Sequence, residues 1–436
     1  MTLETALPRA DASGAESVRT SGYRKATLRI IPFLFVCYFF AYLDRVNVGF
    51  AKLHMLSDLQ FSEAVYGLGA GIFFIGYFFF ELPSNLIMHR VGARRWISRI
   101  MISWGLISAA MAFVTTPAMF YILRFLLGVA EAGFFPGIIL YLTYWYPAER
   151  RGRIVSMFMA AIPVSGLLGS PLSGYILDSF QGVHGFAAWQ WLFVIEALPS
   201  CILGVILFFS LADKPAQARW LTRPEIDSIE ADLAAETAKQ DSHSLKAALS
   251  DGRVWLLCLL YFGIQMGVYG MTFWLPTIVK GSGFSSGTMI GVMTAIPYLA
   301  ATIFMIAMGR SADASRRRRL HVAVPIVLGT IGLVGSAAFA GNPAIAIACL
   351  TLATMGTLTA LVLFWSLPTA FLGGLAAAGG LAIINSVGNL AGFVSPYLVG
   401  LIKDATQSTN PALYVIAIAV LGSGLLLLRV PTAVDR

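Results

Sequence analysis

The chain has 436 residues, of which 58% are hydrophobic and 12% charged, and its formal net charge is +8. A typical soluble domain is roughly 25% charged and cannot hide this much apolar surface in one core, so water-soluble fold classes are excluded. The basic residues form short clusters between apolar runs, a pattern that sets membrane topology and does not indicate nucleic-acid binding.

Twelve apolar runs follow one another along the chain, separated by charged residues or by glycine and proline. Each run is long enough to cross a bilayer as a helix of about 20 residues. We therefore predict an all-α membrane protein with twelve transmembrane helices. The runs cover residues 28–49, 64–87, 97–114, 118–143, 154–176, 189–211, 254–279, 287–309, 321–341, 344–366, 380–402 and 411–428.

One long polar stretch, residues 212–253, divides the runs into two sets of six. Its segment Thr222-Arg-Pro-Glu-Ile-Asp is typical of a helix start, and Ile226, Ile229 and Leu233 follow at helical spacing, which predicts a surface helix in a linker. The expected organisation is a disordered cytoplasmic tail over 1–22, six-helix bundles over 23–211 and 254–430 joined by a cytoplasmic linker over 212–253, and a cytoplasmic tail over 431–436.

The basic residues are distributed unevenly between the two sets of loops. With both termini inside, the inner loops and ends hold most of them, and the outer loops hold only Lys52, Lys280 and Lys403. This bias predicts that both termini and the linker are cytoplasmic. The inner set is Arg24, Lys25, Arg90, Arg94, Arg95, Arg150, Arg151, Arg153, Arg310, Arg316, Arg317, Arg318, Arg319 and Arg429.

Short matches recur between the two halves at nearly one offset, which predicts a duplicated six-helix unit. Transporters that rock two bundles around a central site are built in this way. The clearest matches are Phe61-Ser62 with Phe284-Ser285, and Gly174-Tyr-Ile-Leu-Asp178 with Gly400-Leu-Ile-Lys-Asp404.

Ionisable residues well inside the predicted spans are confined to the first half. Such side chains are costly in a bilayer unless they are paired or face a cavity, so each is a candidate for function. Arg124 and Glu131 share one face of the fourth span, with Gly128 between them. A guanidinium in such a place can hold a carboxylate, and a carboxyl group there can load and release protons. The full set is Asp44, Arg45, Glu81, Arg124, Glu131 and Glu196.

Structural explanations of these charges stay open at this point. The alternative to a functional role is that Asp44 with Arg45, and Arg124 with Glu131, are ion pairs that hold helices together. Glu81 precedes a basic loop and is interpreted as a partner of the loop arginines, and Glu196 is interpreted as structural. The sequence contains no metal-ligand cluster and no nucleophile–base motif, so we expect neither an enzyme nor a bound metal or cofactor.

The second half offers neutral polar and aromatic groups inside its spans. A buried amide needs a hydrogen-bonding partner, and aromatic rings can line a ligand cavity. The candidates for the second wall of a substrate cavity are Gln265, Tyr269, Trp274, Trp365, Ser366, Asn385 and Asn389.

The whole chain resembles the major facilitator superfamily. The loop after the second span is similar to its signature Gly-x-x-x-Asp-Arg-x-Gly-Arg-Lys/Arg, except that Asn85 and His89 replace the usual Gly and Asp. Within it, Tyr42-Leu-Asp44-Arg45-Val-Asn47 and Arg124-x-x-x-Gly128-x-x-Glu131-Ala-x-x-Phe135-Pro136 resemble the anion:cation symporter family. Bacterial members of that family take up tartrate, phthalate, hydroxyphenylacetate and sugar acids. Phe364-Trp365-Ser366-Leu-Pro368 and Ile384-Asn385-Ser-x-Gly388-Asn389 resemble its tartrate and aromatic-acid branch.

The resemblance implies proton-coupled uptake of a small organic carboxylate by alternating access, carried out by a monomer in a bacterial cytoplasmic membrane without a cofactor. An organic-ion exchanger or exporter is the runner-up, and a transporter-like sensor that signals through the linker is a more distant alternative. By the same resemblance, the proton sites are Asp44 and Glu131, the substrate carboxylate is held by Arg45 and Arg124, and the cavity is lined by Tyr42 and Tyr77.

Overall fold

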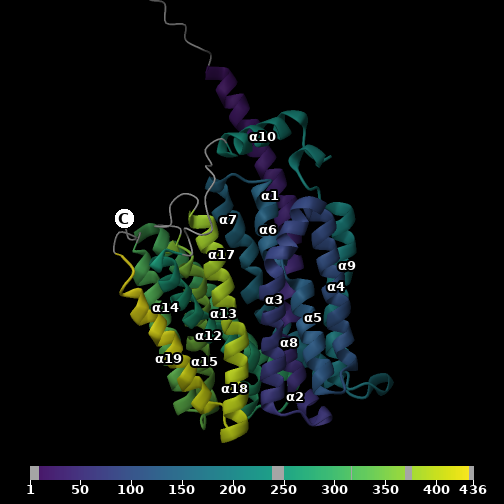
Figure 1. Ribbon diagram of the computed structural model, residues 1–436, viewed down its shortest axis with the longest axis vertical. Coiled ribbons are helices and arrows are strands. Elements are labelled where there is room, and N and C mark those ends of the chain that lie inside the picture. Colours follow the sequence, from purple (N-terminus) through teal and green to yellow (C-terminus); the bar gives the residue numbers. More distant parts are fainter. Residues whose placement is uncertain (1–8, 238–249, 316, 369–375, 432–436) are drawn as a thin grey trace, which may run out of the picture.

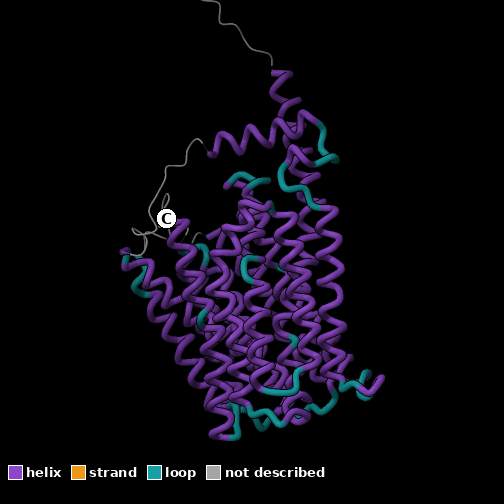
Figure 2. The backbone as a smooth tube through the Cα atoms, turned by 45° about the vertical axis from the view of Figure 1, so that its right-hand side comes forward, coloured by secondary structure: helices purple, strands orange, loops and turns teal. Residues whose placement is uncertain are grey.

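The computed structural model describes residues 9–237, 250–315, 317–368 and 376–431, and the regular structure in these ranges is helical (Figure 2). Twelve stretches of this part are long and apolar enough to cross a membrane. They confirm the predicted all-α fold with twelve membrane spans.

Several spans consist of two consecutive helices. The first half of the chain forms α1 (Arg9–Val46), α2 (Val48–Leu59), α3 (Glu63–Val91), α4 (Ala93–Ala110), α5 (Pro117–Glu131), α6 (Phe134–Thr143), α7 (Ala148–Met159), α8 (Ala161–Ser179) and α9 (Ala188–Ser210). The second half forms α12 (Gly252–Gly281), α13 (Gly287–Ser315), α14 (Arg318–Ala338), α15 (Pro343–Phe364), α17 (Ala376–Asn389), α18 (Ala391–Thr406) and α19 (Asn410–Leu427). Between the halves lies α10 (Arg223–Thr237), and short 3₁₀ helices cover Met111–Phe113, Val183–Gly185 and Pro215–Gln217.

The two halves form two helix bundles that stand side by side. In Figure 1 the purple and blue helices of the first half lie on the right, and the green and yellow helices of the second half lie on the left. The bundles meet where α8 packs on α13, α3 packs on α18 and α2 packs on α12. The start of α1, the end of α19 and α10 all lie at one end of the molecule (Figure 1).

Two spans break directly after charged residues. Helix α1 ends at Val46, just after Asp44 and Arg45, and the chain resumes as α2 at Val48. Helix α5 ends at Glu131, because Ala132 leaves helical geometry and Gly133 has a φ of +88°, a conformation that favours glycine. The break after α5 is of the kind found at transporter binding sites, where free helix ends face a polar cavity, whereas Asn47 between α1 and α2 keeps helical φ and ψ angles.

Helix α10 packs along the first turns of α1, which corrects the expectation of a disordered tail over 1–22. Residues 9–22 are helical, whereas residues 1–8 and 432–436 lie outside the described ranges. The reason is a set of polar contacts with α10: Arg19 Nε and the Tyr23 hydroxyl each donate to Asp232 at 2.8 Å. Lys25 Nζ lies 2.7 Å from a carboxylate oxygen of Glu225.

At the end opposite the termini, two aspartates each cap a helix of the other bundle. Asp404 at the end of α18 accepts hydrogen bonds from the backbone N–H groups of Glu63 and Ala64 in α3, at 3.0 and 2.8 Å. Asp178 at the end of α8 accepts from the backbone N–H groups of Gly287 and Thr288 in α13, both at 2.8 Å. A carboxylate satisfies the unpaired N–H groups of a helix start and interacts favourably with its dipole. These aspartates are the residues that matched between the two halves of the sequence.

A lysine-rich cluster adds to these contacts at the same end. Lys52 Nζ lies 2.7 Å from Glu63 Oε2 and 3.4 Å from the centre of the Trp274 ring, across the bundle boundary. Lys403 Nζ also forms an ion pair with Glu63. The expectation that Lys52, Lys280 and Lys403 lie in outer loops is therefore corrected: they belong to α2, α12 and α18. We call this end, with its two aspartate caps and its lysine cluster, the closed end.

Removing both aspartate caps is expected to open the closed end. A double variant Asp178→Ala and Asp404→Ala loses two helix caps, each worth about 1 kcal/mol. Spin labels on Gln60 and Ser408, which belong to opposite bundles, should then report longer distances. The control is Asp313→Ala, which removes an exposed acid elsewhere. An unchanged distance distribution in the double variant would show that the caps do not hold this end closed.

The contact of α10 with α1 is expected to depend on Glu225. Burial alone would raise the pKa of Glu225, but hydrogen bonds from Lys25, from the Thr222 backbone and from Ser21 lower it to about 2. The contact is thus fully present above the ordinary glutamate pKa and is lost as the pH falls toward 2. Glu225→Gln removes the charge at neutral pH and should speed hydrogen exchange across α10, whereas the exposed Glu230→Gln should not. Equal exchange in both variants would contradict this role.

Candidate functional site

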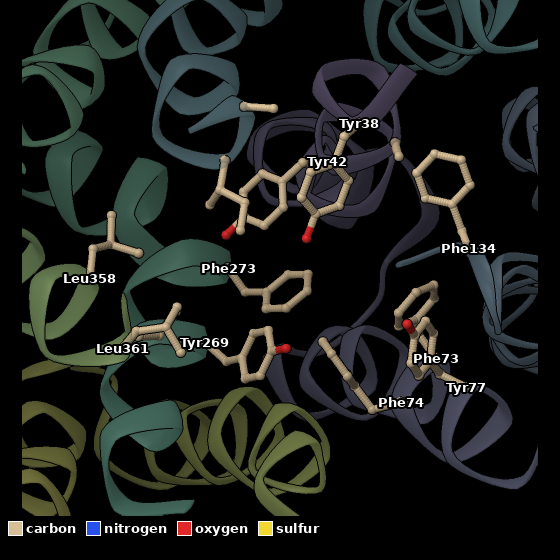
Figure 3. Packing of buried hydrophobic residues seen from close by; sticks show 14 of the residues in the cluster. Tyr38, Tyr42, Phe73, Phe74, Tyr77, Phe134, Tyr269, Phe273, Leu358 and Leu361 are labelled. Atoms are coloured by element: carbon tan, nitrogen blue, oxygen red, sulfur yellow. The ribbon is translucent and has the colours of Figure 1, made fainter. Parts of the chain in front are cut away.

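A cavity lies between the two bundles, and aromatic rings form much of its wall. Figure 3 shows the rings of Tyr38, Tyr42 and Phe74 from one bundle and Tyr269 from the other around this region. Arg45 is the one formally charged side chain in its lining within the described part of the chain. The lining residues are Tyr38, Tyr42, Arg45, Phe74, Tyr77, Phe135, Met159, Ile162, Tyr261, Gln265, Val268, Tyr269, Leu361, Trp365, Asn385 and Asn389.

Arg45 forms a buried ion pair with Glu131 at the wall of this cavity. Its Nε donates to Glu131 Oε1 at 3.0 Å, and its Nη2 contacts the same oxygen. The guanidinium lies 5.3 Å from the centre of the Phe73 ring and 5.5 Å from that of Tyr77. The Glu131 side chain is only 1% exposed, and that of Arg45 is 10% exposed. The pair joins the broken end of α1 to the broken end of α5, and only Arg45 faces the cavity.

Arg124 lies behind the cavity wall. Its Nε donates to the carbonyl oxygen of Gly69 at 3.1 Å, and its Nη2 donates to that of Ala70 at 3.2 Å. Gly128, one turn further along α5, allows α3 to approach, because a Cβ at this position would overlap the carbonyl oxygen of Phe73. Arg124 therefore binds the backbone of α3, and it is not paired with Glu131 in this structure.

Asp44 faces the interior of the first bundle, away from the cavity. Its carboxylate accepts hydrogen bonds from Trp104 Nε1 at 3.0 Å, Ser108 Oγ at 3.2 Å and Ser200 Oγ at 2.5 Å. Neighbouring residues on a helix point about 100° apart, so Asp44 and Arg45 cannot share one partner easily. The two acids expected to bind protons thus lie in different surroundings.

The second bundle contributes a group of amide and phenol side chains. The Tyr269 hydroxyl donates to Asn389 Oδ1 at 3.0 Å, and Gln265 Nε2 donates to the Tyr261 hydroxyl at 3.2 Å. The carbonyl oxygen of the Gln265 side chain is buried and makes no hydrogen bond with the described residues. A ligand with an N–H or O–H group can satisfy this oxygen.

Glu81 contacts the second bundle, which corrects its interpretation as a partner of loop arginines. Its Oε1 accepts a hydrogen bond from Asn385 Nδ2 at 3.3 Å. The sequence places Glu81 near the basic loop, but helix α3 continues through Pro83 to Val91, so the loop lies more than two turns away. Glu81 and Asn385 form a contact between the bundles next to the cavity.

The structure brings most of the predicted site residues to one place. Eight line the cavity together, whereas Glu131 contacts it only through Arg45. The other predicted residues do not line it: Asp44, Arg124, Trp274 and Ser366. Sequence reasoning missed Tyr38, Phe74 and Tyr261 as lining residues. The available signal was helical spacing, since each precedes a predicted lining residue by three or four positions. The eight are Tyr42, Arg45, Tyr77, Gln265, Tyr269, Trp365, Asn385 and Asn389.

Residues 34–396 match the sequence profile of the Major Facilitator Superfamily. This chain belongs to that superfamily. Relatives include a proposed metabolite transport protein, NicT, from Pseudomonas putida, which is 48% identical over 94% of each chain. A proposed tartrate transporter from Agrobacterium vitis is 49% identical over 93% of this chain and 90% of its own length. A quinolone resistance transporter from Acinetobacter baumannii is 42% identical over 91% of this chain and 92% of its own length.

The fold also matches solved structures. The xylose transporter XylE from Escherichia coli, in a partially occluded inward-open conformation, has a TM-score of 0.73 at 15% identity and covers 93% of this chain and 98% of its own. The chain is therefore a multi-pass membrane transporter of the superfamily, and not an enzyme. Within the described residues no group of three or more His, Cys, Asp or Glu side chains is arranged to hold a metal ion.

Arg124 is expected to contribute to stability. Arg124→Gln removes two charge-assisted hydrogen bonds to buried carbonyl groups, each worth about 1.5–3 kcal/mol. The thermal unfolding temperature of the purified protein in detergent should fall by several degrees. The control is Arg99→Gln, an exposed arginine on α4 that stacks on Trp96, which should change the unfolding temperature little. Equal unfolding temperatures for the two variants would mean that Arg124 does not hold α3 in place.

Proposed function

We propose that this protein takes up a small organic carboxylate together with protons, by alternating access of the cavity between its two bundles. The observation that carries the proposal is the position of Arg45, whose guanidinium faces the cavity while it is paired with Glu131. A guanidinium in a largely apolar cavity binds carboxylates well, because both partners are shielded from water. The named tartrate transporter among the relatives supports a carboxylate substrate.

The Arg45–Glu131 pair provides a physical link between the proton and the anion. While Glu131 is ionised, its carboxylate occupies the guanidinium that a substrate carboxylate needs. A proton on Glu131 removes the negative charge and leaves Arg45 available to the substrate. When the proton leaves, Glu131 competes again and expels the anion. Binding of the proton and binding of the anion are then coupled, because each changes the binding free energy of the other.

Other predicted residues have supporting roles in this proposal. Asp44 is the second proton site, and Arg124 adds positive charge close to Glu131 while it holds α3. The second bundle orients the rest of the substrate through Gln265 and Asn389, with Trp365 and Asn385 beside them. Tyr42 and Tyr77 complete the wall of the first bundle.

In this proposal the bundles rock so that the cavity opens in turn at the closed end and at the end that carries the termini. Hydrogen bonds and ion pairs join the bundles at the cavity and toward the closed end. The distribution of basic residues supports a cytoplasmic position for the termini in a bacterial inner membrane. The proposed transporter is a monomer, because one chain contains both bundles and the cavity between them. It needs no cofactor, because each charge that crosses the membrane contributes about 2.3 kcal/mol per 100 mV of membrane potential.

The substrate class is tested first by ligand-dependent thermal stabilisation of the purified protein. The panel contains small mono- and dicarboxylates, sugar acids, aromatic acids, neutral sugars and organic cations. We expect stabilisation by one carboxylate class, stronger at about pH 6 than at about pH 7.5. Arg45→Gln should weaken that binding at least about tenfold, whereas the exposed Arg153→Gln should not. Stabilisation by neutral or cationic ligands alone would contradict the proposal.

Glu131→Gln tests the coupling. In liposomes with an alkaline interior, the wild-type protein should accumulate the selected acid against its gradient. Glu131→Gln should lose this accumulation and retain exchange of labelled for unlabelled substrate, because the neutral side chain no longer responds to protons. The exposed Glu149→Gln serves as the matched control and should accumulate normally. Full accumulation by Glu131→Gln would overturn the role of Glu131.

The same assay separates the other candidate functions. Net outward movement driven by an inward proton gradient would identify an exporter, a function that the quinolone resistance relative favours. Exchange without net accumulation in the wild-type protein would identify an exchanger. Ligand binding without any transport in liposomes that contain only this protein would favour a sensor.

A further inference from the structure

A second polar layer lies inside the first bundle, separate from the cavity. Asp44 and Asn47 are three residues apart at the broken end of α1, and Glu196 and Ser200 are four residues apart on α9, which packs against α1. Their exposed fractions are at most 1%. None of the four lines the cavity. We refer to these four residues as the inner polar layer.

The hydrogen bonds that Asp44 accepts favour its ionised form. Its two oxygens accept three hydrogen bonds, from Trp104 on α4, Ser108 on α4 and Ser200 on α9. The indole N–H has no acceptor capacity, so at least this partner requires a lone pair on Asp44. A carboxylate that accepts several hydrogen bonds is stabilised in the charged state.

Glu196 has a different environment. One oxygen accepts a hydrogen bond from Ser173 Oγ of α8 at 2.6 Å, whereas Oε2 is buried and makes no hydrogen bond with any described residue. The Asn47 side chain faces Glu196, yet neither atom of its amide meets hydrogen-bond geometry in the described structure. An ionised Glu196 would leave a charged oxygen unpaired at this depth, which is costly. A protonated Glu196 can instead donate from Oε2 to the amide oxygen of Asn47, which pairs these two oxygens.

The two acids have no lysine or arginine partner in the described part of the chain. Among the described residues, neither Asp44 nor Glu196 forms an ion pair with a lysine or an arginine. Arg45 on α1 pairs with Glu131, and Lys52 on α2 pairs with Glu63. The other titratable groups close enough to interact with Asp44 are Glu131 and the Cys201 thiol on α9. The neighbouring helices direct only neutral polar side chains toward the two acids in the described part of the chain. These are Trp104 and Ser108 of α4, Ser173 of α8 and Asn47 after α1.

We infer that Asp44 and Glu196 together form a second proton-binding site, in which Glu196 holds the proton in this conformation and Asn47 accepts its hydrogen bond. The inference rests on the proposed function for its role in transport, and it adds Glu196 to the residues that carry protons. The proton leaves from Glu196 Oε2 to water when the site becomes hydrated, and returns from water in the reverse step. Because Asn47 is the residue between α1 and α2, and Asp44 lies three positions before it, a change at this junction during rocking changes the site directly.

The coupling ratio gives the decisive transport test. The reversal potential of proton-coupled flux in liposomes reports protons moved per substrate, a ratio that does not depend on rate, yield or stability. Glu196→Gln keeps the shape and the Ser173 contact but cannot exchange a proton, so the ratio should fall by about one relative to wild type. Glu149→Gln should leave the ratio unchanged. A purely structural Glu196 would alter rate or stability and leave the ratio at the wild-type value, which would overturn the inference.

A second measurement does not require a substrate. Infrared spectra of the wild-type protein in lipid at neutral pH should contain a carboxylic-acid C=O band that Glu196→Gln removes and Glu149→Gln retains. If wild type shows no proton-coupled carboxylate transport but the band behaves as expected, the proposed function fails and the proton site stands. A band identical in wild type and Glu196→Gln would overturn the site. If Glu196→Gln does not fold, two other variants replace it. The carboxylic-acid band should persist in Glu196→Asp, which keeps a carboxyl group, and should change in Asp44→Asn, which removes the partner acid.

Sodium provides the remaining discrimination. Two carboxyl groups, an amide oxygen and hydroxyl groups are also ligands that a small cation accepts. Titration with sodium chloride against potassium chloride at constant pH should leave the carboxylic-acid band unchanged. Loss of the band with sodium alone would show that the layer binds a sodium ion, and would overturn its assignment to a proton.

Discussion

A buried ion pair between two broken helices governs the arrangement of this transporter. Arg45 and Glu131 pair with each other, because either charge alone would be costly inside the hydrocarbon layer. Their pairing joins α1 to α5 at the positions where both helices break, and it leaves one edge of the guanidinium facing the space between the bundles. The site is therefore neutral as found, and its capacity for an anion depends on whether Glu131 remains the partner of Arg45.

The two bundles divide the work unequally. The first bundle contains the charged groups: the Arg45–Glu131 pair at the cavity, and Asp44 with Glu196 behind it. The second bundle presents neutral amides and phenols, which can bind a ligand through directional hydrogen bonds and carry no charge. The bundles are nevertheless related where they meet at the closed end, since Asp178 and Asp404 cap each other's partner helices in the same way. The two halves thus share these contacts at the closed end, whereas the buried charges at the cavity lie in the first half.

Much of this was predictable from the sequence, although the partners of the charges were not. Charged and polar side chains inside the predicted spans were the signal for Arg45, Gln265 and Asn389, and all three line the cavity. Spacing does not indicate which helix lies opposite. The two pairs that are near in sequence, Asp44–Arg45 and Arg124–Glu131, are not the pairs that form. Glu81 likewise contacts Asn385, more than 300 positions further along the chain.

The thickness of the hydrocarbon layer and the cost of an unpaired charge in lipid act on each segment separately. The order of residues was therefore enough to predict twelve spans, their division into two halves, and the small set of charged residues inside the spans. Pairing depends instead on helix rotation, on helix breaks such as the one at Gly133, and on small residues such as Gly128 that let backbones approach. These are properties of the packed molecule. Only the tertiary structure joined Arg45 to Glu131, turned Asp44 toward Ser200 and the layer that holds Glu196, and closed one end with contacts between the bundles.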